Sequence, residues 1–518
     1  MVPLLVLIKS FMPPSYTTHR HHASTYSIFR LWINILRFAL GFTVMAAYTP
    51  AMRLFDTLTK TVRELRPSDG QAYRFYCCGP TVYGPAHIGN FRTFVLQDVL
   101  RRVLETGGTP TVHVRNITDV DDKTIRDAHK AGQTLGAFTA GWTAIFHADC
   151  AKLGLLAPHI EPSAASHIPQ QIAMIEALIA NGHAYASADG SVYFRISSFG
   201  GYGKLSGLDH RELDLGKTQN SRANADEYEK ASVADFVLWK ARRPEDGENF
   251  WPSPWGDGRP GWHLECSAMI REYLGDSFDL HSGGVDLVFP HHENEIAQSM
   301  CACGGNFAAH WFHITHLLVD GGKMSKSLGN LYTLADLEAR GCSAMEVRYV
   351  LLGGHYRKSL NFTFDSLTAA REALAKLAKG SRALAANMGS DQVLDGAGFG
   401  PFQAAWDNLN DDLNTPGALG GLFTGLREAA NLTGKDAATA LAGFNRLLWA
   451  LGLILPTAAP AEVEIPAVIH ALAEARWQAR QAKDWGQSDT LRAELAAHGW
   501  VVKDGKDAYT LTPTPRLS

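Results

Sequence analysis

Two short motifs in this chain carry residues that suit a nucleotide phosphate site. The first, His87-Ile88-Gly89-Asn90, lies between a predicted strand and a predicted helix. A phosphate at such a junction meets free backbone N–H groups and the positive end of the helix. The imidazole of His87 can donate to phosphate oxygens, and Gly89 lets a nucleotide approach the backbone closely. Taken alone, a motif this short matches an ordinary loop more often than a nucleotide site.

The second motif, Lys323-Met324-Ser325-Lys326-Ser327, follows a Gly321-Gly322 turn far downstream. Two lysines in a loop suit a site where negative charge develops on departing pyrophosphate. A solvated basic loop is the alternative for such lysines. The two motifs together, in this order and with the first on a strand–loop–helix unit, are far more specific than either alone.

In this pairing of motifs the chain resembles the class I aminoacyl-tRNA synthetases. The resemblance implies catalytic roles for His87, Asn90, Lys323 and Lys326. It also implies that ATP, with Mg²⁺, binds at Gly79, His87, Gly89, Asn90 and Lys326. The fourth position of the first motif is often His in the family and is Asn90 here. An amide can still donate, so the departure leaves open only how much this position contributes to nucleotide binding.

A histidine and a glutamate after Pro290 offer ligands for a metal ion. His291 and Glu295 are four residues apart, so on a helix that begins after Pro290 they share one face. They supply a nitrogen and an oxygen, both of which Zn²⁺ accepts, and two thiolates such as Cys78 and Cys266 would complete four ligands. The alternative is a solvated helix rich in His and Glu.

Spacing alone does not choose among the nearby thiols and imidazoles. Cys77 adjoins Cys78, His292 adjoins His291, and a Cys-x-Cys pair lies at 301–303. Adjacent side chains of a strand face opposite ways, so Cys77 and Cys78 cannot both be ligands. Spacing leaves His292 and the pair at 301–303 open as ligands.

Three segments resemble the cysteinyl-tRNA synthetases specifically. They read Cys-Gly-Pro-Thr-Val-Tyr at 78–83, Gly-Trp-His-Leu-Glu-Cys-Ser-Ala-Met at 261–269 and Phe-Pro-His-His-Glu-Asn-Glu at 289–295. The resemblance runs from about Met52 to the end of the chain and includes 115–119 and 411–416. It implies one zinc ion held by Cys78, Cys266, His291 and Glu295. It also implies a cysteine pocket lined by Thr118, Trp262 and Asp286, although a buried Trp or a helix-capping Asp would account for two of these residues.

The resemblance implies ATP-dependent activation of L-cysteine to cysteinyl-adenylate and transfer to the 3′-terminal adenosine of cysteine tRNA. Serine is nearly isosteric with cysteine, so pocket size rejects it poorly. A thiolate binds Zn²⁺ strongly whereas an alcohol stays protonated, so the metal reads the one atom that differs. One alternative is a zinc-dependent cysteine ligase that acylates an amino-sugar amine, which has no use for a long back half. The other is a non-catalytic RNA-binding paralogue, against which Lys326, His87 and the four ligands speak.

The elements that must position these residues can be read from the same sequence. A strand at 73–78 ends at Gly79-Pro80, a helix spans about 90–105 and closes at Gly107-Gly108, and a strand follows at 111–115. This is a βαβ unit, the start of a parallel nucleotide-binding sheet. Further strands are predicted at 235–240 and 317–319, and Ala- and Leu-rich helix follows about residue 364.

The predicted fold class is α/β, with a Rossmann-like parallel-sheet catalytic domain that carries an insertion, then an α-helical bundle and a small C-terminal domain. The predicted segments are a leader at 1–51, the catalytic domain at 52–161 and 235–315, an inserted connective segment at 162–234, a segment with the lysine motif at 316–364, a helical domain at 365–455 and the C-terminal domain at 466–518. The family resemblance implies that the segment at 316–364 contacts the acceptor stem of tRNA and that the helical domain at 365–455 binds the anticodon. Within the C-terminal domain, Arg476, Arg480, Lys483 and Trp485 suit a cation-and-aromatic surface for unstacked bases. A solvated helix face is the alternative, and residues 503–508 depart from the family pattern.

The composition of the chain neither favours nor excludes a tRNA enzyme. A chain of 518 residues is too long for one core. A net charge of −4 argues against nonspecific coating of nucleic acid, so a tRNA enzyme must gather its cations locally. Seven cysteines without a regular framework suggest a reducing compartment, and we expect a cytoplasmic monomer that does not bind membranes.

The leader, residues 1–51, differs from the rest of the chain because it has four basic residues and no acidic one. The favoured interpretation is a start codon assigned upstream of the true one at Met52. A targeting segment and an interfacial helix are the alternatives. Its apolar stretch carries Arg30 and Arg37, which makes a poor membrane span.

Overall fold

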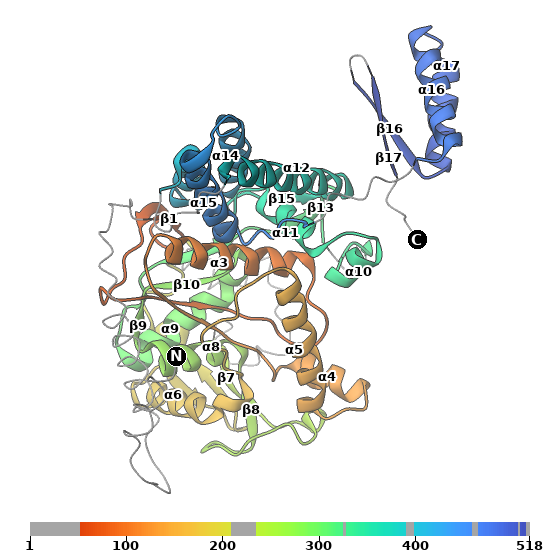
Figure 1. Ribbon diagram of the computed structural model, residues 1–518. Helices are drawn as coiled ribbons and strands as arrows, with labels where there is room; N and C mark the ends of the chain where they lie inside the picture. Colours follow the sequence, from red (N-terminus) through yellow and green to blue (C-terminus); the bar gives the residue numbers. More distant parts are fainter. Residues whose placement is uncertain are drawn as a thin grey trace, which may run out of the picture. The chain divides into compact units, whose positions relative to one another are not determined.

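The computed structural model describes residues 52–208, 235–324, 328–389, 398–457, 465–505 and 508–513 (Figure 1). The leader and Lys326 lie outside these ranges. None of the described helices is long and apolar enough to cross a membrane.

Four parallel strands form the sheet on which the site is built. They are β3 (Tyr73–Cys77), β4 (Thr111–Arg115), β10 (Leu280–Gly284) and β12 (Trp311–Ile314), in the order β12-β10-β3-β4. The βαβ unit predicted from sequence is confirmed, because β3 and β4 pair in parallel on either side of the predicted helix in the chain. Ligands of such sheets bind beyond the carboxyl ends of the strands. Cys78, Asn116 and the turn η6 (Val285–Leu287) all follow strands at that edge.

Helix α3 (Ile88–Thr106) is the crossover of this unit and packs on β4 and β10 on one side and on α11 and α15 on the other (Figure 1). It begins two residues before the predicted start because His87 caps it. The helix ends at Gly107, and Gly108 turns the chain with φ of +88°.

The inserted segment forms its own antiparallel sheet. Its strands are β5 (Ala184–Ala186), β6 (Val192–Phe194), β7 (Phe236–Ala241) and β8 (Gly258–Pro260), and α6 (Ile168–Ala180) precedes them. The predicted boundary at 234/235 therefore falls inside this sheet, because β7 pairs with β6 and not with the parallel strands. Strand composition in a sequence does not report which strand will be the partner.

The catalytic half contains further elements in the described residues. They are β1 (Arg53–Asp56), β2 (Thr61–Glu64), α4 (Asp122–Lys130), α5 (Leu135–Lys152), α8 (Trp262–Leu274), β9 (Ser277–Phe278), the helical turn η7 (Val288–His292), α9 (Glu293–Cys303) and β11 (Phe307–Ala308).

The segment that carries the lysine motif is a small three-stranded sheet with two helices. Strand β13 (Leu317–Val319) lies between β14 (Gly322–Lys323), its antiparallel neighbour, and β15 (Leu360–Phe362), its parallel neighbour. Helices α10 (Leu334–Ala339) and α11 (Ala344–Leu352) lie between β14 and β15 in the chain. The predicted strand at 317–319 is confirmed.

The predicted helical back half is also confirmed, but it shares a core with the catalytic half. Its helices are α12 (Phe364–Met388), α13 (Gln403–Asn410), α14 (Thr415–Glu428) and α15 (Gly434–Leu451). Phe444 and Leu447 of α15 belong to the same buried apolar cluster as Val99 and Val103 of α3. Burial of this kind is the main stabilising term of a fold.

A buried carboxylate joins the same two parts. Asp98 of α3 accepts hydrogen bonds from Arg102 (2.8 Å) and from Arg348 (2.6 Å) of α11. The two guanidinium groups also donate to carbonyl oxygens at the end of α15, Arg102 to Trp449 (3.1 Å) and Arg348 to Leu451 (2.9 Å). Each charge is thereby paired and hydrogen-bonded, as a buried ion must be.

The C-terminal residues form a separate small domain. It contains α16 (Ala467–Gln481), α17 (Trp485–Ala497) and the hairpin β16 (Trp500–Asp504) and β17 (Tyr509–Pro513). Its own apolar cluster is built from Ile469, Ala473, Leu495, Trp500 and Val502.

Candidate active site and metal centre

The first turn of α3 fixes the side chain of His87. The Nδ1 atom of His87 accepts the backbone N–H of Asn90 (3.3 Å), and Asn90 Oδ1 accepts the backbone N–H of His87 (3.1 Å). Burial lowers the pKa of His87, while the charge of Asp286 opposes that shift. The neutral ring with Nδ1 as acceptor carries its proton on Nε2. The arrangement therefore leaves Nε2–H as a donor at the positive end of a helix.

The two predicted nucleotide motifs meet at this turn. The backbone N–H of Ile88 donates to Tyr332 O (2.9 Å), and His87 pairs with Thr333 in a short antiparallel bridge. A Cβ atom placed on Gly89 would lie 3.0 Å from the His87 ring and 3.3 Å from the sulfur of Met324. Glycine at this position lets Met324 of the lysine motif pack against the turn. Lys323 is exposed at the end of β14.

Gly79 lies just beyond β3 at the carboxyl edge of the sheet. Its N–H donates to Asn116 Oδ1 (2.8 Å), and a Cβ atom there would lie 1.6 Å from the carbonyl oxygen of Asn116. Only glycine fits so close to the residue after β4. This packing accounts for Gly79 independently of its predicted contact with ATP.

The four predicted metal ligands come together from four parts of the chain. The ligand atoms of Cys78, Cys266, His291 and Glu295 all lie within 4.8 Å of one another, and all four residues are buried. Cys78 follows β3, Cys266 is on α8, His291 is in η7 and Glu295 is on α9. His291 Nε2 lies 3.0 Å from Glu295 Oε1, as expected for residues four apart on one helical face. Cys77 packs in the core beneath α3, on the other face of the strand.

The ionisation of these groups favours a cation among them. A hydrogen bond from the Cys78 thiol lowers the pKa of Cys266 to about 6 despite burial. Burial opposes charge on Glu295, but His281 and His291 lower its pKa to about 2. Burial likewise opposes protonation of His291, and Glu295 and Cys266 nonetheless raise its pKa to about 10. A thiolate and a carboxylate are therefore ready beside an imidazole whose proton a metal would displace.

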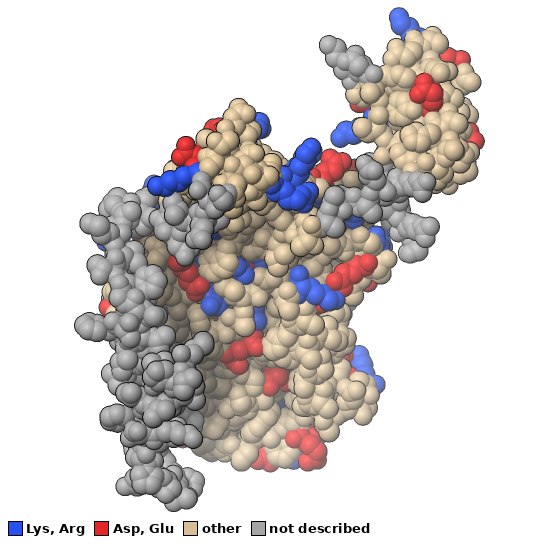
Figure 2. All heavy atoms as spheres, in the orientation of Figure 1, with Lys and Arg blue, Asp and Glu red and all other residues tan. Residues whose placement is uncertain are grey.

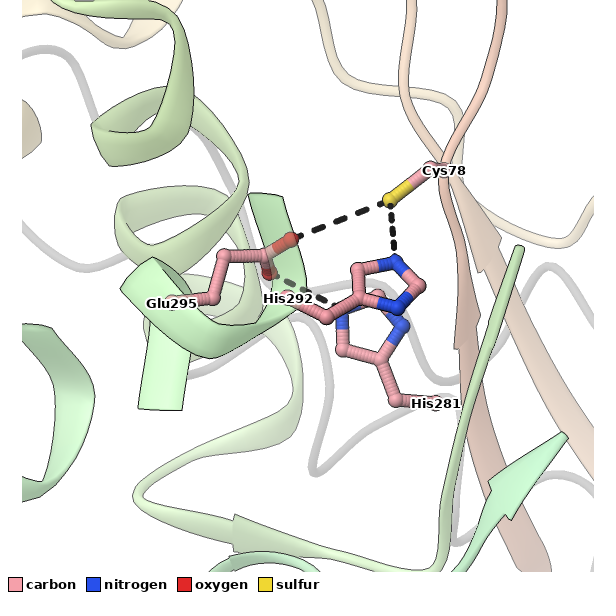
Figure 3. A group of neighbouring side chains, drawn as sticks. All are labelled: Cys78, His281, His292 and Glu295. Carbon is pink, nitrogen blue, oxygen red and sulfur yellow. Dashed lines mark hydrogen bonds and ion pairs between the residues drawn. The ribbon is translucent and has the colours of Figure 1, made fainter. Parts of the chain in front are cut away.

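A second set of four shares Cys78 and Glu295 and adds two histidines, as Figure 3 shows. His292 Nε2 lies 3.4 Å from Cys78 Sγ, and His281 Nε2 lies 2.8 Å from Glu295 Oε2. His292 Nδ1 is in turn 2.7 Å from His313 Nε2. Spacing had left His292 open as a ligand, whereas His281 and His313 were not predicted. Their only signal is a histidine in each of two otherwise apolar or small-residue strands.

Of the predicted cysteine-pocket residues, Trp262 contacts this cluster directly. The ring of Trp262 stacks on that of His291, with centroids 4.3 Å apart and an angle of 26°. Thr118 is buried, and its Oγ1 accepts from Asn116 Nδ2 (3.1 Å). Asp286 is exposed in η6 and acts electrostatically on His87.

Asn116 is a residue of the site that was not predicted from the sequence. Its amide contacts Gly79 and Thr118, and Cys266 Sγ lies 3.8 Å from its Oδ1. One buried side chain thus connects the metal cluster to the carboxyl edge of the sheet. Because Asn116 directly follows a predicted strand, its place at that edge was a usable signal.

The predicted RNA-facing residues of the C-terminal domain separate into two groups. Arg476 is 1% exposed and forms a bidentate ion pair with Asp504, so its predicted role in a base-binding surface is wrong. Arg480 also pairs with Asp504 (3.1 Å). Lys483 and Trp485 are exposed, Trp485 by 57%. The partner that the sequence did not reveal is Asp504, which lies in the hairpin beyond a second helix.

Two family models match this chain. The family described as "tRNA synthetases class I (C) catalytic domain" matches residues 64–372, and "Cysteinyl-tRNA ligase anticodon binding domain" matches residues 462–510. Together with the parallel sheet and the two motifs at α3, this defines a class I aminoacyl-tRNA synthetase. A methionyl-tRNA synthetase of Mycobacterium tuberculosis, in complex with methionyl-adenylate, has the same fold with a TM-score of 0.51 at 14% identity, over 74% of this chain and 89% of that one.

The relatives of this chain include proteins described as "Cysteine--tRNA ligase". That of Opitutus terrae is 56% identical over 471 residues, which cover 90% of this chain and 100% of the relative. That of Chlamydia caviae is 44% identical over 466 residues, which cover 88% and 96%. The chain belongs to the cysteine–tRNA ligase family.

Proposed function

We propose that this site activates L-cysteine with ATP and transfers the cysteinyl group to the 3′-terminal adenosine of cysteine tRNA, with one zinc ion beside the substrate thiol. The observation that carries the proposal is the convergence of two thiols, an imidazole and a carboxylate within 4.8 Å at the carboxyl edge of the sheet. Trp262 on His291 and Asp286 near His87 connect this cluster with the phosphate end of the site.

The donor chemistry fits zinc. Sulfur, nitrogen and oxygen donors in one buried set of four are typical Zn²⁺ ligands. We assign Cys78, Cys266, His291 and Glu295 because this set has two thiols and one of them, Cys266, has a low pKa.

The histidines of the second set have a different role. His281 contacts the Glu295 carboxylate, and His292 contacts both Cys78 and His313. Partners of this kind orient metal ligands and tune their basicity.

Zinc, when bound, supplies a soft Lewis acid that favours the thiolate of cysteine over the alcohol of serine. Trp262 would close the side of the pocket against His291, and Asp286 would pair with the substrate ammonium. Thr118, held by Asn116, would line the floor. These contacts leave the carboxylate of cysteine directed to the nucleotide end.

At the nucleotide end, side chains and backbone groups would stabilise the negative charge of the ATP phosphates. The carboxylate oxygen of cysteine attacks the α-phosphorus of ATP, and the bond to pyrophosphate breaks. His87 Nε2–H would donate to a phosphate oxygen, with Gly79, Gly89 and Asn90 around the nucleotide. Lys323 and Lys326 would stabilise the charge that develops on the pyrophosphate and on its Mg²⁺ complex. In the second step a hydroxyl of the terminal adenosine attacks the carbonyl carbon, and AMP leaves.

The tRNA would contact the back half and the C-terminal domain. Figure 2 shows Lys and Arg side chains gathered over α12, the helix on which Lys376, Lys379 and Arg382 are exposed three residues apart on one face. A local cationic patch lets a chain of net negative charge contact the phosphate backbone of tRNA. The match of residues 462–510 to an anticodon-binding domain supports tRNA contact by the C-terminal domain and speaks against an amino-sugar acceptor.

Pyrophosphate exchange with cysteine, followed by charging of cysteine tRNA, tests the proposal. Cysteine-dependent exchange, zinc at one equivalent and charging of cysteine tRNA are expected. Exchange with cysteine but transfer only to amino sugars would favour the alternative ligase.

We further propose that the enzyme works as a monomer in the cytoplasm. All seven cysteines are free, which suits a reducing compartment. Light scattering after gel filtration and cell fractionation test these two points.

A further inference from the structure

Arg92, in the second turn of α3, is fully buried and has an unusual set of partners. Its Nη1 donates to the carbonyl oxygens of Thr315 (3.0 Å) and His316 (2.6 Å). Its Nη2 donates to those of His355 (3.2 Å) and Lys358 (2.7 Å). Burial lowers the pKa of Arg92 to about 10. All four terminal N–H groups thus go to carbonyl oxygens, and each prong of the guanidinium holds a different segment.

These two segments form the base of the small sheet that carries Lys323. Residues 315–316 lead into β13, and residues 355–358 lead into β15. Leu317 of β13 pairs with Leu360 of β15, and Leu318 pairs with Lys323 of β14. The backbone N–H of Gly321 also donates to the side-chain Oδ1 of Asn361 (2.7 Å). Arg92 is thereby connected to Lys323 through the segments that begin β13 and β15 and through the pairing of β13 with β14.

The same two turns of α3 hold the far side of this segment. Ile88 N–H donates to Tyr332 O, and His87 pairs with Thr333. The stretch of chain from His87 to Arg92 is thereby attached to the residues both before and after the lysine motif. An apolar side chain would fill the Arg92 site without burying a charge, so packing alone does not account for a guanidinium there.

We propose that Arg92 is a positioning residue for adenylate formation, which sets the location of Lys323 relative to His87. This rests on the proposed roles of His87 and Lys323 toward the phosphates of ATP. Lysine cannot replace Arg92 in this role, because one ammonium group cannot span two segments as the planar fork does.

The test measures cysteine-dependent pyrophosphate exchange in full-length Arg92→Lys. We expect kcat to fall by about 10- to 100-fold, the range for a small misplacement of a catalytic group. The KM for cysteine and the zinc content should stay within about twofold, because no metal or pocket residue is touched. Arg101→Lys is the matched control. Arg101 is also a buried arginine of α3, but it donates to Ala157 O, outside the Lys323 segment. It should keep kcat within about twofold.

A double-mutant cycle separates positioning from general damage. If Arg92 acts through Lys323, then Arg92→Lys should lower kcat by no more than about twofold in a Lys323→Ala background. Multiplicative losses in the double variant, or normal exchange in Arg92→Lys with Lys323→Ala impaired, would overturn the positioning role and leave the proposed function intact. Normal exchange in Lys323→Ala would instead remove the proposed role of Lys323, and the inference with it.

A second variant covers the outcome in which Arg92→Lys does not fold. Asn361→Ala removes the bond to Gly321 from an exposed position on the same sheet. It should lower kcat in the wild-type background and have little effect when Lys323 is alanine. Independent effects of Asn361→Ala and Lys323→Ala would show that the placement of this sheet does not act through Lys323, which contradicts the proposal.

Discussion

The Nδ1 atom of His87 accepts the backbone N–H of Asn90, and Asn90 Oδ1 accepts that of His87, so each residue caps the other at the start of α3. Removing only the Asn90 side chain, as in Asn90→Ala, keeps the bond to Nδ1 and loses the one to Oδ1. The expected cost is about 1 kcal/mol of unfolding free energy. Chemical denaturation measures that loss, and the KM for ATP in pyrophosphate exchange should rise only a few-fold.

Asn90→Asp serves as the control for this change because it retains an acceptor for the His87 N–H. A loss of exchange by more than about 100-fold in both Asn90→Ala and Asn90→Asp would show that the amide N–H₂ group contacts the reacting phosphates directly, because both changes remove it.

Loss of one of the four proposed zinc ligands should change the amino-acid selectivity of the enzyme. Cys266→Ser should lose zinc, measured by elemental analysis, and weaken cysteine binding while ATP binding is largely kept. A site that pairs the distinguishing group of its substrate rejects analogues by roughly 10⁴, so the ratio of cysteine to serine activation should collapse with the metal.

Cys303→Ser is a matched control, because Cys303 belongs to neither set of four and is only half-buried. It should retain one zinc and full selectivity. Active wild-type enzyme without zinc would refute the assignment.

Lys326 lies outside the described residues and is proposed to act on the pyrophosphate of ATP. Lys326→Ala should lower cysteine-dependent pyrophosphate exchange by about 100-fold or more, because a cation opposite the developing charge is lost. Zinc should stay bound. The exposed Lys130 of α4 gives a control, Lys130→Ala, with the same loss of charge and unchanged exchange. Near-normal exchange in Lys326→Ala would exclude a catalytic role.

A truncation after Thr457 separates the two steps. The C-terminal domain has its own core, so its removal should leave pyrophosphate exchange within a few-fold while tRNA charging falls strongly. A truncation near Asn361 is not equivalent, because it removes Phe444 and Leu447 from the core they share with α3. Charging kinetics with cysteine tRNA measure the effect, and full charging by the shorter protein would contradict an anticodon role.

Asp504 gives a pH-dependent prediction. The hydrogen bond from Arg476 holds the pKa of Asp504 below its ordinary value, and burial opposes this only in part. A carboxyl with a depressed folded pKa adds stability that is complete above the unfolded value of about 3.9 and is lost as pH falls through the folded pKa. Asp504→Asn removes the charge opposite the buried Arg476 and should destabilise the C-terminal domain by about 1 kcal/mol or more at neutral pH.

Hydrogen exchange of the α16 amides measures the difference in stability between the wild-type protein and Asp504→Asn. It should stay constant from about pH 7 to pH 5 and shrink only below about pH 4. A difference that already vanishes near pH 6 would show that the Arg476 pair is not its source.

The parts of the fold that depend on local pattern could be predicted from the sequence. The βαβ unit and the helices after residue 364 were right because strand breakers and apolar periodicity are local signals. The predicted ligands Cys78, Cys266, His291 and Glu295 lie together, but their choice over neighbouring thiols and imidazoles rested on family resemblance. Their roles stay predictions until metal is measured.

The features that could not be predicted from the sequence depend on contacts between residues distant in the chain. His281 and His313 face the cluster only because β10 and β12 are neighbours in the sheet. Strand β7 joins β6 for a reason of the same kind. The predicted role of Arg476 was wrong because its ion-pair partner, Asp504, lies beyond a second helix in a hairpin.

The shared carboxylate of Asp98 has a calorimetric consequence. Arg102 and Arg348 bind both this carboxylate and the last carbonyl groups of α15. Detaching the bundle while α3 stays folded would therefore break these hydrogen bonds and expose the apolar core that α3 and α15 share. The nucleotide sheet and the bundle should therefore melt in one endotherm, and the C-terminal domain, whose core is separate, in another. Substituting Asp98 should lower the temperature of the first endotherm and leave the second in place. A chimera that transfers the bundle to another protein would therefore need to include α3, because the two form one cooperative unit.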